Sequence, residues 1–144
     1  MSHRAHTTIR QLIYVSTAVQ LMQPGEVVEL LRMARARNEE LDVSGLLLYA
    51  DGNFIQVIEG APVHVEQLFR RIKRDPRHGR FIVLLDHMAE HRDFDGWRMG
   101  FEQPSMREMR ELIGLADLNH PDAALRLLDS FRRTILHRFP SGLP

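Results

Sequence analysis

The sequence predicts an α+β fold of the ferredoxin-like βαββαββ type, with a mixed five-stranded sheet, two helices on one face and a C-terminal helical pair. Three features lead to this prediction. Short apolar segments and two amphipathic segments follow one another in the order β-α-β-β-α-β, with one more apolar segment after them. Each amphipathic segment opens on a proline, Pro24 or Pro62, which suits the first turn of a helix. Asp51-Gly52, between the second and third apolar segments, is typical of a two-residue hairpin turn.

The first strand and helix are predicted from their apolar periodicity. Residues 9–16 alternate, so that Tyr14 shares one face with Leu12 and Ser16, while the opposite face carries Ile9, Gln11, Ile13 and Val15. The following helix is expected to end near Asn38. Its apolar residues recur at i, i+3, i+4 and i+7, at Val27, Leu30, Leu31 and Ala34.

The hairpin joins an apolar run at residues 43–50 to the stretch FIQVIEG at residues 54–60, and the two are expected to pair antiparallel. Alternation places Gln56 on one face of its strand together with Phe54 and Ile58. A buried amide without partners costs about 1–3 kcal/mol. Gln56 therefore needs a partner in an otherwise apolar layer.

The second helix and the last strands complete the sheet. The helix carries the apolar stripe Val65, Leu68, Phe69 and Ile72. It is expected to stop before Asp75-Pro76, because a residue before proline disfavours helical angles. Residues 81–85 are predicted as a fourth strand and residues 97–101 as a fifth. On the fifth strand, one face is expected to hold Trp97, Met99 and Phe101.

The chain divides into a flexible N-terminus at residues 1–8, a folded domain at residues 9–103 and a C-terminal segment at residues 104–144. In the last segment, residues 106–115 and 121–139 are expected to be helical. A sheet with helices on one side leaves its other face bare. The helical pair is therefore expected to cover that face or to make an oligomer contact.

Composition narrows the classes of function. The 144 residues contain 19 Lys and Arg against 19 Asp and Glu, so no net charge favours nucleic acid or a membrane surface as a partner. There is no cysteine, which removes disulfides and thiolate chemistry. No signal peptide or membrane span is recognised, and a cytoplasmic protein is expected. Metal binding is not expected, because His87 and His91 are placed in a polar loop without evident partners.

Several polar residues call for a ligand or for one another. Tyr14 and Gln56 lie on strands that are neighbours in this topology, and a phenol cannot satisfy a whole amide. Asn38 at the end of the first helix and the DPRH segment after the second could border one cleft between the helices. Each residue also has a plain interpretation: a buried Tyr–Gln pair, a helix C-terminal Asn, a solvated loop, and core packing for Trp97 and Met99.

Five motifs in register resemble the BLUF family, the flavin-binding blue-light sensors, over residues 9–103. They are LIYVS with Tyr14, ARARNEELDVSGLLLY with Asn38, DGNFIQVIEG with Gln56, DPRH with Arg77 and His78, and FDGWRMGF with Trp97 and Met99. The chain departs from the family in having Arg37 before Asn38, at the expected cleft entrance, and Ser44 where threonine is commoner. Neither change touches Tyr14, Gln56 or Asn38.

The resemblance implies FAD, bound non-covalently between the two helices. It implies that Tyr14 donates an electron and a proton to the excited flavin, and that Gln56 lies between tyrosine and flavin. Asn38 and Arg71 would contact the pyrimidine edge of the flavin. The ribityl or ring-edge region would be lined by Asp75, Arg77 and His78, and the surrounding residues that carry the signal would be Ser16, Trp97 and Met99.

The predicted function is therefore a photoreceptor without enzyme activity that signals to a separate effector protein. The photoreceptor itself is expected to be a homo-oligomer. An amide can relay a proton while staying neutral and can then rotate or tautomerise. Two alternatives remain on the same scaffold. One is a small acylphosphatase-like hydrolase with an Arg/Asn pair, which would need a glycine-rich anion loop that the chain lacks between its first strand and first helix. The other is a flavin-free ligand-sensing module that dimerises.

Overall fold

The computed structural model describes residues 8–103 and residue 107. Its elements follow the predicted order along the chain. They are β1 (Ile9–Ala18), α1 (Pro24–Leu41), β2 (Ser44–Ala50), β3 (Asn53–Gly60), α2 (Pro62–Arg74), β4 (His78–Ala89) and β5 (Gly100–Glu102). Except for Thr8 and Arg107, the predicted flexible N-terminus and the predicted C-terminal helical pair lie outside the described residues.

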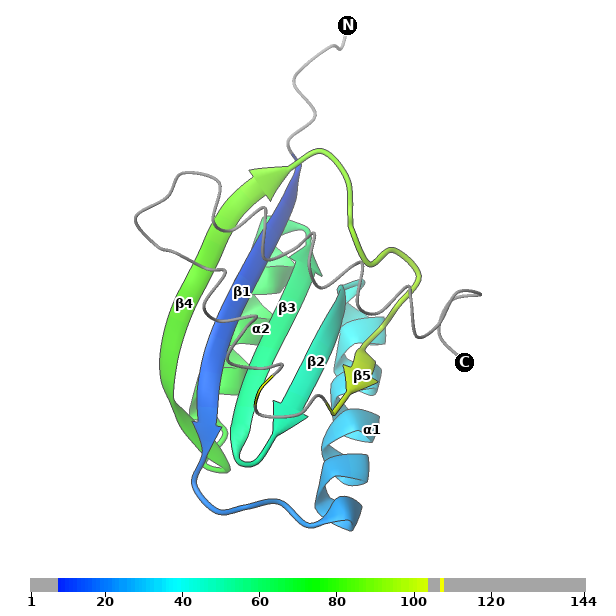
Figure 1. Cartoon of the computed structure of the whole chain (residues 1–144). Coiled ribbons are helices and arrows are strands. Elements are labelled where there is room, and N and C mark those ends of the chain that lie inside the picture. The colour runs from blue at the N-terminus through cyan, green and yellow to red at the C-terminus, as the bar shows by residue number, and fades with distance from the viewer. Residues whose placement is uncertain (1–7, 104–106, 108–144) are drawn as a thin grey trace, which may run out of the picture.

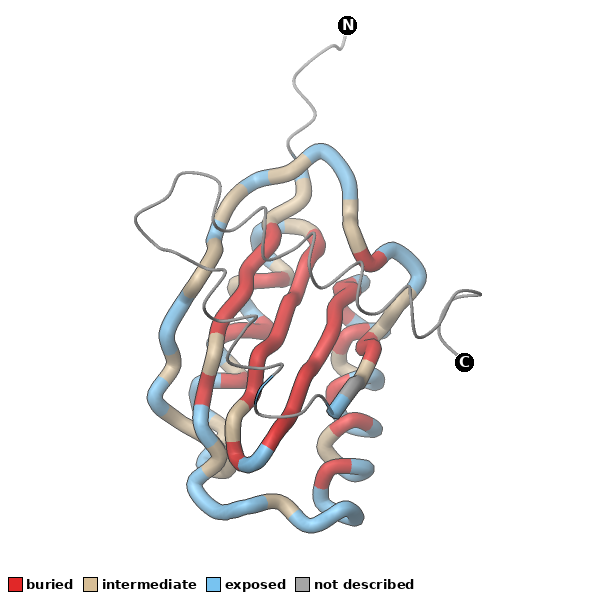
Figure 2. Tube along the Cα trace, viewed as in Figure 1, coloured by how far each residue is buried: buried red, intermediate tan, exposed pale blue. Residues whose placement is uncertain are grey.

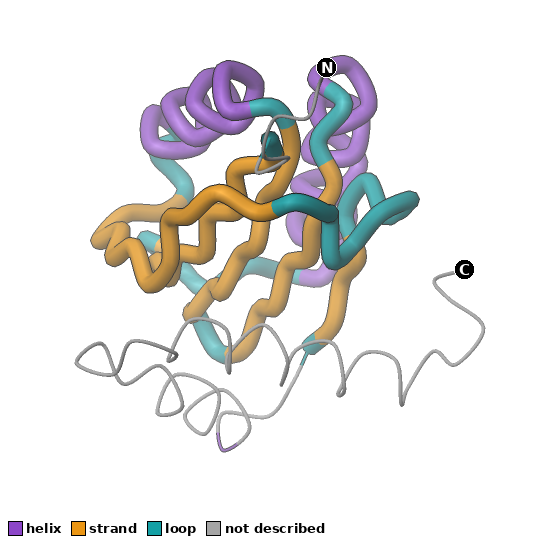
Figure 3. The backbone as a smooth tube through the Cα atoms, turned by 90° about the horizontal axis from the view of Figure 1, so that it is seen from above, coloured by secondary structure: helices purple, strands orange, loops and turns teal. Residues whose placement is uncertain are grey.

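The strands form one mixed sheet in the order β4-β1-β3-β2-β5. The three pairs β1–β3, β1–β4 and β2–β3 are antiparallel, while β5 runs parallel to β2. Both helices cover the same face of this sheet (Figures 1 and 3). The predicted α+β class, the mixed five-stranded sheet and the two helices on one face are confirmed.

The β2–β3 hairpin forms where the sequence predicts it. Asp51 and Gly52 have φ angles of 48° and 86°, the left-handed conformations that the two-residue turn requires. The turn pairs Ala50 with Asn53 and fixes the register of both strands. Farther along β2, Gly45 lies so close to the backbone of β3 that an added Cβ would overlap the carbonyl oxygen of Val57.

The core has one layer on each face of the sheet. The layer under the helices joins Leu12, Tyr14 and Ile58 of the strands to apolar residues of both helices. The opposite layer contains Ile13, Ile55 and Val57 with other apolar side chains. Figure 2 shows that β1, β3 and β2 are buried along most of their length, whereas the residues of β4, at the sheet edge, are intermediate or exposed. The alternation predicted for β1 and β3 is confirmed.

Helix boundaries differ little from the predictions. Helix α2 ends at Arg74, directly before Asp75-Pro76, as predicted. Helix α1 continues three residues past Asn38, because Leu41 is buried in the core and Asp42 then takes the left-handed conformation that ends the helix. Within the described residues, neither helix is long and apolar enough to cross a membrane.

The two last strands are where the sequence-based boundaries are wrong. β4 is longer than predicted and includes His87, whose Nε2 lies 2.6 Å from Oε1 of Gln11, so His87 is neither in a loop nor without a partner. β5 begins only at Gly100. The preceding segment turns, with the Trp97 amide donating to the Phe94 carbonyl at 3.0 Å.

Because of this turn, the predicted common face of Trp97, Met99 and Phe101 is also wrong. Trp97 packs in the apolar layer on the face of the sheet opposite to the two helices. Met99 is buried in the layer under the helices, and Phe101 packs against that same layer. Alternation holds only for extended backbone, and residues 90–99, between β4 and β5, are not in a strand.

Candidate functional site

Tyr14 and Gln56 face each other directly across β1 and β3 and form a buried hydrogen bond. The Tyr14 hydroxyl donates to Oε1 of Gln56. Tyr14 is fully buried, and Gln56 is 7% exposed. Burial is the main reason why the pKa of Tyr14 lies above its ordinary value; the Asp75 carboxylate acts in the same direction, while Arg37 opposes both. The phenol is therefore held neutral.

The amide nitrogen of Gln56 has a much weaker partner than the amide oxygen. Nε2 lies 3.7 Å from the Met99 sulfur, and a thioether is a weak acceptor. The Met99 backbone is held in turn, because Arg35 Nε donates to its carbonyl at 3.0 Å. Gln56 thus links Tyr14 on one side to Met99 on the other, with donor capacity to spare.

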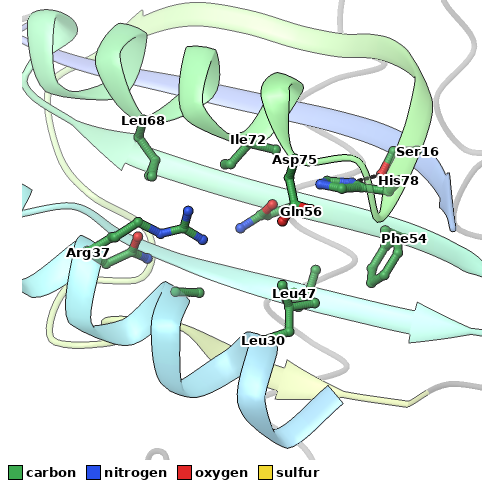
Figure 4. A pocket seen from close by; sticks show the side chains of 12 residues that line it. Ser16, Leu30, Arg37, Leu47, Phe54, Gln56, Leu68, Ile72, Asp75 and His78 are labelled. Atoms are coloured by element: carbon green, nitrogen blue, oxygen red, sulfur yellow. Dashed lines mark hydrogen bonds between the residues drawn. The ribbon is translucent and has the colours of Figure 1, made fainter. Parts of the chain in front are cut away.

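A pocket opens beside Gln56 between α1 and α2 (Figure 4). Its empty volume is about 450 Å³, which includes the opening toward solvent. Mainly apolar walls with a few polar groups are typical of small-molecule sites. The lining residues are Ser16, Leu30, Ala34, Arg37, Asn38, Leu47, Phe54, Gln56, Leu68, Ile72, Asp75 and His78.

Helix α1 contributes two polar side chains to the pocket. Asn38 is buried, and its Nδ2 donates to the carbonyl of Arg98, which ties the end of α1 to the segment before β5. Arg37 and Gln56 extend toward one another in Figure 4. The Nε of Arg37 is buried without a hydrogen-bond partner, and burial lowers the pKa of this guanidinium. A buried donor without an acceptor is costly, so the site favours a polar ligand next to Arg37.

The other polar wall comes from the end of α2 and the start of β4. Asp75 pairs with Arg77, with Oδ2 2.5 Å from Nη2, and this bond is the main reason why the pKa of Asp75 lies below its ordinary value. His78 Nδ1 lies 3.1 Å from the Ser16 hydroxyl. Burial lowers the pKa of His78, which favours the neutral imidazole.

The structure brings together most of the residues that the sequence singled out, but not all of them. Asn38, Gln56, Asp75 and His78 line the pocket with Ser16, and Tyr14 lies directly behind Gln56. Arg71 and Arg77 are not among the lining side chains. Trp97 lies on the opposite face of the sheet, with its ring 5.7 Å from that of Phe94.

The sequence pattern assigns some residues of the pocket to core packing instead. The apolar wall residues Leu30, Ala34, Leu68 and Ile72 belong to the helical stripes that the periodicity assigned to packing alone. Arg37, expected only at the entrance, is part of the wall. In the part of the chain that the structure describes, no three His, Asp or Glu side chains gather closely enough to hold a metal ion.

Comparison with known proteins gives consistent matches. A family model described as "Sensors of blue-light using FAD" matches residues 9–100. The photoactivated adenylate cyclase subunit beta of Euglena gracilis is 40% identical over 95 residues, which is 65% of this chain and 11% of that protein. The chain therefore spans only about a tenth of the curated relatives that it matches.

Solved structures agree with the family match. The dark-state structure of BlrB, a BLUF protein, is 30% identical with a TM-score of 0.71, and the match covers 90% of this chain and 99% of that one. The ground state of BlsA is 27% identical with a TM-score of 0.62, covering 74% of this chain and 72% of that one.

Proposed function

The chain belongs to the BLUF family of blue-light sensors that use FAD, and on that premise we propose that Tyr14 and Gln56 convert light absorption into a signal. The observation that carries the proposal is the buried hydrogen bond from the Tyr14 hydroxyl to Gln56, beside a pocket between two helices. An oxidisable phenol and a neutral amide are thereby in contact in a site shielded from water.

The residues of the pocket fit FAD. Its apolar walls come from both helices and suit a flat aromatic ring. Gln56 and the unpartnered Nε of Arg37 supply donors for polar ring atoms. We propose that Asn38 also contacts the polar edge of the ring. For Asp75 and His78, which line the pocket, and for Arg77 beyond its wall, the proposed role is to hold the ring edge and the ribityl chain. Arg71, also outside the wall, is proposed to reach the pyrimidine edge of the ring.

The proposed steps depend on Tyr14 and Gln56. Bound FAD supplies the absorption of blue light and an excited state that takes up one electron. Tyr14 gives up that electron, and its hydroxyl proton moves to Oε1 of Gln56, the atom that it already contacts. Electron and proton then return to Tyr14, while the Gln56 amide keeps a new arrangement by rotation or tautomerisation. Because the two ends of an amide have opposite hydrogen-bonding character, the new arrangement presents a different group to the pocket.

The signal needs an element that is already close to balance between two states. One net hydrogen bond is worth about 0.5–1.5 kcal/mol, whereas inverting a 1:99 equilibrium needs about 5.5 kcal/mol. We propose that this element is β5 with the segment before it, because Met99 contacts Gln56 and its unbranched side chain can repack. The proposed receiver is a separate effector protein. A homo-oligomeric state and a cytoplasmic location stay predictions from the sequence.

We propose no enzyme activity for the described domain. An acylphosphatase-like hydrolase would need free backbone donors at the start of the first helix to bind an anion. In α1 this end is occupied by its own residues. Glu26 Oε1 accepts from the Gln23 backbone amide at 3.0 Å, and the Glu26 backbone amide donates to the Gln23 carbonyl at 2.9 Å.

The test is a visible spectrum before and after blue light, on the wild-type chain and on Gln56→Leu. The wild type is expected to bind FAD and to show a reversible red shift. Gln56→Leu is expected to keep FAD but lose the shift, because leucine cannot exchange donor for acceptor. Gln67→Leu is the matched control, since Gln67 is exposed on α2. A normal red shift in Gln56→Leu would remove Gln56 from the mechanism.

A further inference from the structure

A buried carboxylate, Glu59, lies on the face of β3 opposite to the flavin pocket. It is fully buried and accepts four hydrogen bonds. Two come from side chains, Gln11 Nε2 at 2.9 Å and the Ser44 hydroxyl at 3.0 Å. Two come from backbone amides of the β4–β5 connection, Asp93 at 2.9 Å and Phe94 at 2.6 Å. Glu59 thus holds this connection against the sheet.

The guanidinium of Arg92 completes the polar cluster around Glu59. Its Nη1 lies 3.0 Å from the Ser44 hydroxyl and 3.5 Å from the Glu59 carbonyl, and its Nη2 donates to the Asp42 carbonyl at 2.7 Å. A buried carboxylate is tolerated only where donors and an opposite charge surround it. Here two of the donors and the opposite charge of Arg92 come from the β4–β5 connection, so the carboxylate and the connection hold each other in place.

The hydrogen bonds at Phe94 also set the position of Trp97. The Trp97 amide donates to the Phe94 carbonyl at 3.0 Å, and the two rings lie 5.7 Å apart. The Trp97 carbonyl accepts from the Gly45 amide of β2 at 2.9 Å. Phe94 and Trp97 therefore form one packed unit on the face of the sheet opposite to the two helices, and Glu59 holds the start of this unit.

Beyond Trp97 the segment crosses to the other face of the sheet. Figure 1 shows the connection running from the end of β4 to β5, beside β2. Met99 lies in the layer under the helices, with its sulfur 3.7 Å from Gln56 Nε2. Gln56 and Glu59 belong to the same strand and project to opposite faces. β3 therefore contacts both ends of the segment 93–99: Glu59 binds its first residues, and Gln56 contacts Met99 at its end.

From this geometry, and resting on the proposed function, we propose that Glu59 is a positioning residue of the light response: it anchors residues 93–99 so that Met99 is set against Gln56. The carboxylate is required because all four groups facing it are donors. A glutamine at this position turns one acceptor oxygen into an NH₂ group. Because Asp93 N–H donates to one oxygen of Glu59 and Phe94 N–H to the other, that NH₂ group then faces a backbone donor in either orientation.

The experiment uses the full chain loaded with FAD and compares Glu59→Gln with wild type. Trp97 is the only tryptophan, so its emission reports on the connection alone. In the dark, Glu59→Gln is expected to shift this emission to longer wavelength and to raise its quenching by acrylamide. After light, the return of the absorption spectrum is expected to change by about five-fold, the factor for one net hydrogen bond. Glu90→Gln is the control, since Glu90 is 61% exposed in the same connection.

The outcomes separate this proposal from the proposed function. Absence of a red shift in the wild type contradicts the proposed function. The Trp97 emission of Glu59→Gln and of the wild type is compared in the dark, so this comparison does not depend on a light response. An unchanged tryptophan signal in Glu59→Gln, or a changed one with a normal return rate, overturns the positioning role. If Glu59→Gln does not fold, Ser44→Ala is the second variant, because it removes one donor to Glu59 and one of the acceptors of Arg92. It is expected to change both signals in the same direction, less strongly. Wild-type signals in Ser44→Ala would then count against the proposal.

Discussion

Replacing Tyr14 by phenylalanine removes one oxygen atom from the protein core and keeps the ring. The ring packs against Phe69 and Phe81, with centroid distances of 5.1 and 5.6 Å, and these contacts do not need the hydroxyl. What is lost is the donor to Gln56 Oε1. Because Gln56 is only 7% exposed, the unpaired amide oxygen is expected to cost about 1–3 kcal/mol of unfolding free energy.

Gln56→Leu removes the other partner of the same hydrogen bond. It leaves the fully buried Tyr14 hydroxyl without its acceptor, at a similar expected cost of about 1–3 kcal/mol. The double variant leaves neither polar group behind, and replacing both partners by apolar groups of similar shape is nearly neutral. Its cost is therefore expected to fall short of the sum of the two single costs by about 0.5–3 kcal/mol, the range for residues in contact.

Urea unfolding measures this coupling in the wild type, Tyr14→Phe, Gln56→Leu and the double variant. The unfolding is followed by circular dichroism in the dark and without FAD. Tyr49→Phe combined with Gln56→Leu provides the matched control. Tyr49 is also buried, but its hydroxyl accepts from the Met22 amide at 3.1 Å, so the control pair is expected to be additive. Additivity of Tyr14→Phe and Gln56→Leu within about 0.5 kcal/mol would refute the reasoning that the two groups satisfy each other. In the light, Tyr14→Phe is expected to block the normal response.

Two further predictions concern pH and packing. Burial lowers the pKa of His78 below its ordinary 6.5, so the unfolded chain takes up a proton first as the pH falls. The stabilisation is therefore expected to be complete above pH 6.5 and to decline as the pH falls toward the lower pKa of the folded state. Urea midpoints measured across this range for the wild type and His78→Phe should show the decline only in the wild type. Gly45→Ala puts a methyl group against the Val57 carbonyl and is expected to cost about 1–3 kcal/mol in the same assay. Gly25→Ala, in open space on α1, is the control and is expected not to destabilise; equal effects of the two would contradict the packing argument.

Most of the fold follows from local patterns. Alternation assigned the faces of β1 and β3, and Asp51-Gly52 marked the hairpin because its two positive φ angles suit few other residues. Prolines marked the start of both helices and the end of α2. The wrong boundary predicted for the fifth strand is caused by contacts between residues far apart in the sequence. Residues 97–99 have an alternating pattern, yet their backbone turns because Glu59 and Gly45, far away in the sequence, hold it by hydrogen bonds.

Features of the site also differ in whether the local sequence or the tertiary structure determines them. The sequence by itself determined which side chains share a face with Tyr14 and with Gln56, since the period of a strand is a local property. That the helices cover these two faces is seen only in the structure. Only the tertiary structure decided that the two pair directly, that Arg37 lines the pocket while Arg71 does not, and that Met99 faces Gln56. Tyr14 and Gln56 are 42 residues apart. Contacts at that separation depend on sheet register and on how helices pack over it, which residue spacing along one element does not specify.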